Sequence, residues 1–205
     1  MTMASTMTQL LLKPWAKPLV WLMCALPWAV LVARALTDSL GANPAEAIEH
    51  STGEWALRFL WASLAITPLR NMLKQPALLR FRRALGVSAF VYALFHLLTY
   101  AAFDKGWVLN DIIKDIFKRN FILVGMLTLI LMTPLALTSF NGAIKWLGAR
   151  RWQALHKLTY AIALLALLHF FWKKSGKHDY AEVSVYAAIL AALLGWRLAR
   201  WRQLI

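Results

Sequence analysis

Three histidines lie inside apolar stretches of the chain, where a polar ring is costly unless it has a partner. His96 lies in the run 84–103, and His156 and His169 lie thirteen residues apart in the run 150–172. Imidazole is a common metal ligand, and burying it in hydrocarbon without a hydrogen bond or a metal costs free energy. Each intramembrane histidine is therefore a candidate for a functional site, and hydrogen-bonded packing is the alternative for each.

The spacing of these histidines predicts two levels across a membrane. At a helical rise of about 1.5 Å per residue, His156 and His169 lie roughly 20 Å apart in depth, and they lie about 140° apart around an ideal helix. His96 is expected at the depth of His169, in the outer half of the membrane. Two imidazoles from neighbouring helices can ligate one haem iron from both sides, which favours one-electron transfer. We therefore predict a bis-histidine haem held by His96 and His169.

The inner level is less complete. No CxxCH sequence is present and Cys24 is the single cysteine, so covalent haem attachment and four-cysteine iron–sulfur sites are excluded and the haem is predicted to be of b type. A second bis-histidine layer would need a histidine where Arg83 stands. The inner site could hold a haem with His156 as its one protein ligand, a quinol, or a flavin whose phosphate is bound by Arg82, Arg83 or Arg151. Alternatively, His156 caps the bundle.

Arg58 is a further candidate for the site. It lies in the apolar run 55–73, one turn from the end that is expected to face outward. Its guanidinium could pair with an anionic group of a bound cofactor, such as a haem propionate. The other interpretation is that the long side chain extends to the outer surface of the membrane.

The composition indicates an integral membrane protein. Hydrophobic residues make up 60% of the 205 residues, which is high for a soluble domain. The net charge of +14 comes from Lys and Arg that cluster in short loops between apolar runs, so it indicates membrane topology and argues against nucleic-acid binding. No GxGxxG, Walker, HExxH or serine–histidine–acid pattern is present. We therefore expect an electron-transfer subunit that has no nucleotide domain and no substrate-reducing site of its own.

The fold class predicted from the apolar runs is an all-α membrane protein, a bundle of six transmembrane helices in one domain of residues 1–205. The six spans are predicted at residues 18–36, 55–73, 84–103, 121–138, 152–172 and 180–198. Pro68 is expected to kink or end the second span, residues 109–117 to form a short interfacial helix, and residues 139–151 to form a basic loop. Inner segments hold most of the Lys and Arg, and all nine acidic residues fall at the outer side, which places both termini in the cytoplasm.

The chain resembles the ferric-reductase-like transmembrane family over nearly its whole length, and three stretches are the most similar. They are HSTGEWALRFLWASLAITPLR from His50, KQPALLRFRRALG from Lys74 running on to HLLTY from His96, and RRWQALHKLTY from Arg150. Ferric reductases and NADPH oxidases carry paired histidines on the third and fifth helices and a cytoplasmic flavin domain. This chain lacks both features, as is typical of the haem-binding membrane subunits of periplasmic methionine sulfoxide reductase systems within the family.

The resemblance implies a multi-pass protein of the bacterial inner membrane, surrounded by lipid, with one or two b haems and FMN. It implies electrons from quinol or a cytoplasmic flavin reductase, and a periplasmic molybdopterin reductase, MsrP, as the acceptor that repairs oxidised periplasmic proteins. His96 and His169 match the family's haem ligands, and His156 is the additional histidine. Two other classes remain open, a self-contained ferric or metal reductase and a non-redox membrane transport or assembly protein.

Overall fold

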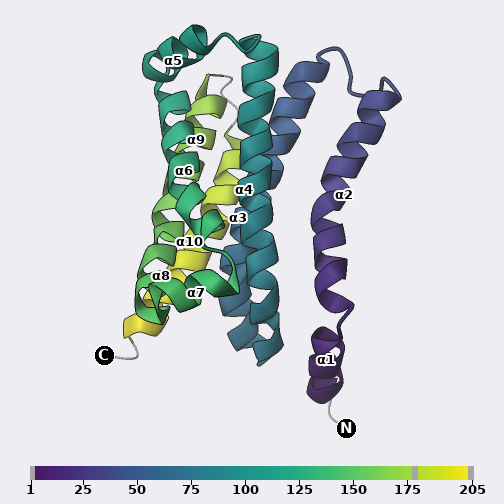
Figure 1. Cartoon of the computed structure of the whole chain (residues 1–205), viewed down its shortest axis with the longest axis vertical. Helices are drawn as coiled ribbons and strands as arrows, with labels where there is room; N and C mark the ends of the chain where they lie inside the picture. Colours follow the sequence, from purple (N-terminus) through teal and green to yellow (C-terminus); the bar gives the residue numbers. More distant parts are fainter. Residues whose placement is uncertain (1–2, 177–179, 203–205) are drawn as a thin grey trace. The chain divides into compact units, whose positions relative to one another are not determined.

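The structure is a computed structural model that describes residues 3–176 and 180–202, and every regular element among them is helical. The elements are α1 (Met3–Leu12), α2 (Ala16–Leu36), α3 (Pro44–Met72), the 3-10 segment η1 (Pro76–Phe81), α4 (Arg82–Thr99), the π-helical turn η2 (Tyr100–Asp104), α5 (Leu109–Lys118), α6 (Asn120–Leu137), α7 (Asn141–Leu147), α8 (Ala149–His156), α9 (Leu158–Ser175) and α10 (Ala181–Arg202) (Figure 1). They form two compact units, one of residues 1–92 with 191–205 and one of residues 93–190. The single domain expected for the whole chain stays a prediction.

Each predicted span coincides with a mainly helical segment. By length and composition, five segments of the described chain are long and apolar enough to cross a membrane. They are Ala16–Leu36, Pro76–Asp104, Asn120–Leu137, Ala149–Ser175 and Ala181–Arg200. The helix α3 is not among them, because acidic and basic side chains interrupt its apolar sequence. The all-helical membrane architecture is therefore confirmed, whereas the sixth span and the cytoplasmic termini stay predictions.

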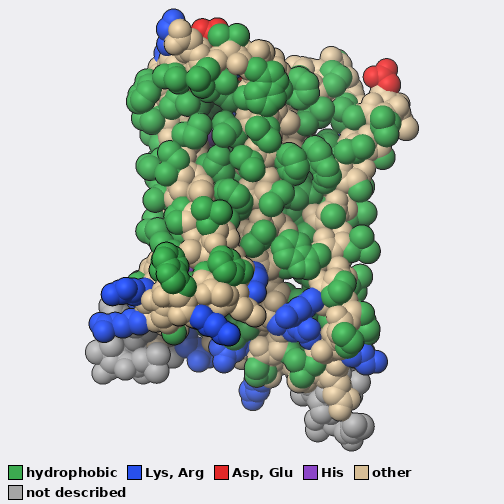
Figure 2. All heavy atoms as spheres, viewed as in Figure 1, with side chains coloured by type: hydrophobic (Ala, Val, Ile, Leu, Met, Phe, Trp, Pro, Cys, Tyr) green, Lys and Arg blue, Asp and Glu red, His purple; other side chains and the backbone are tan. Residues whose placement is uncertain are grey.

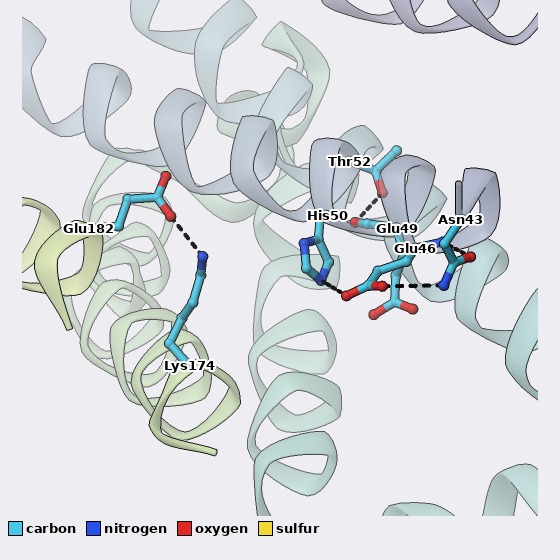
Figure 3. A network of polar contacts seen from close by, with 7 residues as sticks. All are labelled: Asn43, Glu46, Glu49, His50, Thr52, Lys174 and Glu182. Atoms are coloured by element: carbon cyan, nitrogen blue, oxygen red, sulfur yellow. Dashed lines mark hydrogen bonds and ion pairs between the residues drawn. The ribbon is translucent and has the colours of Figure 1, made fainter. Parts of the chain in front are cut away.

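In the first unit, α3 begins well before the predicted start at Trp55. Asn43 caps it, with its Oδ1 accepting from the backbone N–H of Glu46 at 3.2 Å and its Nδ2 donating to the Glu46 carboxylate at 3.2 Å (Figure 3). Pro44 then occupies the first helical turn, where its missing N–H costs nothing. The capping residues thus extend the helix into the segment between the first two predicted spans.

The same helix does not end at Pro68 but continues to Met72. A proline within a helix leaves the carbonyl four residues earlier without its usual N–H donor. In α3 that carbonyl belongs to Leu64, and Arg197 of α10 donates a hydrogen bond to it from Nη2. Arg197 also donates to the Leu193 carbonyl at 2.9 Å. The arginine therefore satisfies a backbone group that Pro68 exposes.

A tyrosine side chain likewise forms hydrogen bonds with backbone groups beside the proline of α2. The hydroxyl of Tyr92 on α4 accepts from the backbone N–H of Trp28 at 2.9 Å and donates to the carbonyl of Cys24 at 2.9 Å. These two backbone groups flank Pro27, the proline inside α2. Insertion of a side chain into the helical hydrogen-bond ladder is a recognised cause of helix bending, and here it also attaches α2 to α4.

Replacing Tyr92 with phenylalanine should lower stability by about 1–2 kcal/mol, because it leaves two buried backbone groups of α2 without this hydroxyl. The effect would be measured as a lower thermal midpoint of the detergent-solubilised protein. Val91→Ala, at an exposed position one residue earlier on the same helix, is the control. Equal midpoints for Tyr92→Phe and the wild type would contradict this role for the hydroxyl.

In the second unit, α6 and α9 run side by side, with α5 at one end of α6 and with α7 and α8 at the other (Figure 1). The short helix predicted at residues 109–117 is confirmed as α5. The basic loop predicted at residues 139–151 is instead mostly helical, since α7 and the first residues of α8 occupy it. Gly148 separates these two helices with a φ of 76°, a conformation that favours glycine. Lys157 interrupts the helix that was predicted to be continuous through His156.

The surface has the polarity expected in lipid. Large hydrophobic side chains cover the sides of α2 and α6, among them Leu22, Leu26, Leu127 and Ile130. The hydrophobic side chains lie along the length of the helices, and the Lys, Arg, Asp and Glu side chains lie near the helix ends (Figure 2). A helix that exposes its apolar residues along its length fits a hydrocarbon solvent.

Candidate functional site

His96 and His169 lie next to each other within the second unit. His96 comes from the last turns of α4 and His169 from α9, and their ring centroids are 6.2 Å apart with the ring planes inclined by 80°. Both side chains are half-buried. The proximity of the two rings agrees with the prediction from the sequence, and haem ligation by the pair remains a prediction.

The pair fits an iron placed between the rings. With metal–imidazole bonds of about 2 Å on each side, two imidazoles on one metal have centroids on the order of 6 Å apart, close to the observed separation. No group of three or more His, Cys, Asp or Glu side chains in the described residues could hold a metal ion without a cofactor. Two imidazoles alone suit a haem, in which the porphyrin supplies the other four ligands.

His169 is held against α6. Its Nδ1 lies 2.6 Å from the carbonyl oxygen of Phe121, and its ring centroid lies 6.0 Å from that of the Phe121 side chain. One turn further along α6, Gly125 leaves the space that the His169 ring occupies. The ring position is therefore fixed by the backbone of a neighbouring helix as well as by its own.

His156 lies at the other end of α6. Its Nε2 is 3.1 Å from the hydroxyl of Thr138, and its ring stacks on Trp152 with centroids 3.9 Å apart. Trp152 Nε1 donates to the Thr138 carbonyl at 2.9 Å. His156 and His169 thus contact positions of α6 that lie about 25 Å apart at the helical rise. The contacts of His156 suit a residue that caps the bundle, and its haem, flavin and quinol roles stay predictions.

Arg58 has a partner within its own helix in the first unit. Its Nη2 lies 2.7 Å from Glu54 Oε2, and its guanidinium lies 4.9 Å from the centroid of the Trp55 ring. Glu and Arg at this spacing commonly pair on a helix. A cofactor would have to share the guanidinium with Glu54, so the pairing of Arg58 with a propionate stays a prediction.

The three arginines considered for a flavin phosphate fall in different units. Arg82 and Arg83 begin α4 in the first unit, and Arg151 is exposed on α8 in the second. Binding of a flavin phosphate by Arg82, Arg83 or Arg151 remains a prediction.

A buried ionic cluster lies at the α5 end of the second unit. Asp115 is 9% exposed and accepts a hydrogen bond from the Tyr100 hydroxyl at 2.6 Å. Lys105 Nζ lies 2.9 Å away, and Arg119 makes a closer ion pair with the same carboxylate. Burial alone would raise the pKa of Asp115, but the hydrogen bonds from Arg119, Lys105 and Tyr100 outweigh it and hold the pKa well below its ordinary value.

Asp115→Asn should destabilise the protein by about 1–3 kcal/mol, because it leaves the two cations of the cluster without their carboxylate. A lowered folded-state pKa stabilises the fold above the unfolded-state pKa of about 3.9, and this stabilisation is lost as the pH falls through the folded-state pKa. The difference in thermal midpoint between the variant and the wild type should therefore stay constant from about pH 5 to pH 8. Asp111→Asn, at an exposed position of the same helix, is the control. A difference in thermal midpoint that disappears between about pH 5 and pH 8 would contradict the lowered pKa of Asp115.

The residues of α6 that contact His169, Phe121 and Gly125, were not predicted from the sequence. Gly125 was a readable signal, because a glycine inside an apolar helical run often marks a close approach. The carbonyl of Phe121 left no signal in the sequence, since any residue supplies the same atom.

The chain is similar to known proteins over most of its length. Residues 52–167 match the family described as ferric reductase like transmembrane component. The relative from Polaromonas naphthalenivorans is 58% identical over 92% of this chain and 86% of its own length. Those from Ralstonia nicotianae and Xanthomonas oryzae pv. oryzae are 48% and 45% identical, over 87% and 98% of this chain and 82% and 92% of their own lengths. All three are named protein-methionine-sulfoxide reductase heme-binding subunit MsrQ. No solved structure matches the chain.

Proposed function

The chain belongs to the family of ferric-reductase-like transmembrane components, with MsrQ proteins as its relatives, and from this membership we propose that it is the haem-binding membrane subunit of a methionine sulfoxide reductase. The observation that carries the proposal is the pair of imidazoles from α4 and α9, whose centroids lie 6.2 Å apart. In this proposal, His96 and His169 are the axial ligands of a b-type haem. A bound haem supplies a one-electron carrier with no open coordination position.

The protein residues around this pair bind and orient the ligands. The Phe121 carbonyl holds the Nδ1 side of His169, so its Nε2 is the nitrogen available to the iron. The half-buried position of both rings limits the access of water. Tyr100, one turn after His96, donates to the buried Asp115, which ties the end of this ligand-bearing segment to α5.

The proposed direction of electron flow is outward across the bacterial inner membrane. Its support is the charge distribution within each unit. In the second unit, the segment that follows α6 carries Lys145, Arg150 and Arg151 and no acidic residue, whereas the α5 end mixes basic side chains with Asp111 and Asp115. Basic residues favour the cytoplasmic side of a membrane protein. We propose quinol or a cytoplasmic flavin reductase as the donor and the periplasmic molybdopterin reductase MsrP as the acceptor.

The inner site is proposed to take electrons from that donor. FMN is the cofactor that the family resemblance suggests there, and its phosphate would be bound by Arg82, Arg83 or Arg151. Guanidinium groups suit a phosphate because they form paired hydrogen bonds with it. His156, at the same end of α6 as α7 and α8, is proposed to act at this level.

The purified protein tests the proposal directly. It should be red, and chemical reduction should give the sharp α-band of a low-spin b-type haem. A colourless protein with full secondary structure, expressed with an adequate supply of haem, would overturn the proposal. A haem protein that rapidly reduces ferric chelates without any periplasmic partner would instead indicate a self-contained metal reductase.

A further inference from the structure

The imidazole of His169 lies directly against the backbone of α6 at Gly125. A Cβ atom at position 125 would lie 2.8 Å from both Cε1 and Nδ1 of the His169 ring and 3.4 Å from Cγ. Contacts below about 3 Å are not tolerated between such atoms, so any other residue would displace the ring. By comparison, a Cβ at Gly86 would meet only Ser63 Oγ at 3.6 Å, and one at Gly195 would meet nothing within 4 Å.

The space at Gly125 allows a specific hydrogen bond. The Nδ1 atom of His169 lies 2.6 Å from the carbonyl oxygen of Phe121, which is one helical turn before Gly125. A carbonyl oxygen can only accept, so Nδ1 carries the proton and donates it. In a neutral imidazole the other nitrogen, Nε2, then carries the lone pair that can ligate a metal. The carbonyl has two lone pairs, so it can accept from His169 while it still takes part in the helix.

The Phe121 side chain supports the same arrangement. Its ring centroid lies 6.0 Å from that of His169, with the planes inclined by 43°. The Phe121 ring also contacts Arg119, whose guanidinium lies 5.3 Å from the ring centroid. Arg119 is in turn paired with Asp115. The backbone and the side chain of Phe121 therefore both contact the His169 ring.

We propose that Gly125 and the Phe121 carbonyl are a positioning site for His169, which fixes the tautomer and orientation of the imidazole for ligation of iron through Nε2. The inference rests on the proposed function. Donation of the second ring N–H to a backbone carbonyl is how metal-binding histidines are commonly oriented, and it makes the ligating nitrogen more basic. A more basic ligand stabilises ferric over ferrous iron, so this contact lowers the midpoint potential of a haem bound at His169.

Gly125→Ala compared with Gly195→Ala tests the inference, since both replace a glycine within a long apolar helix. In the apoprotein of Gly125→Ala, the His169 ring can swing away from the new Cβ, so folding and helix content should match the wild type. In the haem-loaded protein the ring cannot both avoid the Cβ and keep its bond to Phe121. Haem affinity should fall by about 10–100-fold. The midpoint potential should rise, and the ferric low-spin signals in the electron paramagnetic resonance spectrum should move. Gly195→Ala should leave all three unchanged.

Wild-type affinity, potential and resonance spectrum in Gly125→Ala would overturn the inference while leaving haem ligation by His169 intact. Absence of low-spin haem from the wild type would overturn the proposed function and this inference with it. Misfolding of the Gly125→Ala apoprotein would also count against a role limited to the ligand.

The wild type gives a second test, because Nδ1 of His169 in protein labelled with ¹⁵N-histidine should carry a slowly exchanging proton. An unprotonated Nδ1 in the haem-loaded protein would overturn the inference.

Discussion

His96→Ala and His169→Ala should each abolish the low-spin b-type haem or reduce it severely. In the proposed site each histidine supplies one of the two axial ligands, so either substitution opens one side of the iron. The α-band of the reduced protein should be lost or greatly weakened, and any haem that remains should have a high-spin spectrum. Absorption spectra and haem content of the purified variants measure the effect.

The histidines outside the pair are the controls for this experiment. His50 pairs with Glu46 on the first unit's α3, with His50 Nε2 3.5 Å from the carboxylate (Figure 3), and its alanine variant should retain the full spectrum. His156→Ala should keep the haem of the outer level and slow its reduction from the cytoplasmic side. A full low-spin spectrum in both His96→Ala and His169→Ala would contradict the ligand assignment. Loss of all haem in His156→Ala but not in His169→Ala would reverse the two roles.

The positions of the long helices could be predicted because the apolar runs are long and the segments between them are polar. The errors fall where local backbone chemistry extends a helix. The start of α3 was missed although Asn43, Pro44 and Glu46 form a recognisable capping sequence. Its continuation past Pro68 depends on Arg197 from a distant part of the chain, which no local pattern contains. The helix α7 and the first residues of α8 were assigned to a loop because short polar helices carry little periodic signal.

The candidate site could be predicted only in part, because its histidines are visible in the sequence and its backbone contacts are not. His96 and His169 were paired through the order and direction of the predicted helices, and the structure places their rings together. The environment of Arg58 was also readable, since Glu54 precedes it by one helical turn. By contrast, the Phe121 carbonyl becomes a partner of His169 only when α6 and α9 pack together.

A periplasmic acceptor would meet the charged side chains around α5. Asp115 does not contribute to this exposed charge, because it is buried and paired with Arg119, Lys105 and Tyr100. Asp111 remains exposed on the same helix. Lys174 pairs with Glu182 at 2.9 Å across the α9–α10 connection (Figure 3), and Lys177 lies outside the described residues. Only exposed charges can steer the encounter with the acceptor, and the association rate that they increase falls as salt is added.

The other large expected effect is the direction of electron transfer across a membrane vesicle. A membrane-impermeant reduced flavin should reduce the haem in inverted vesicles, in which the cytoplasmic face is outside. In right-side-out vesicles the same reagent should leave the haem oxidised, because the proposed donor site faces the lumen. The reduced haem should then be reoxidised by the periplasmic molybdopterin reductase only when that protein has access to the periplasmic face. The physical reason is the positive-inside distribution of Lys and Arg, which orients the chain in one direction.

NADPH without an added flavin reductase should reduce no haem in either kind of vesicle. The chain contains no glycine-rich dinucleotide motif, and its elements are helices throughout the described residues, whereas such cofactors are commonly bound where a strand leads into a helix. Permeabilised vesicles that receive the flavin control for the amount of reducible haem in each preparation. Equal reduction of intact vesicles of both orientations would contradict the vectorial assignment. Rapid reduction of the pure protein by NADPH alone would instead place a dinucleotide site within these helices and remove the need for a separate donor protein.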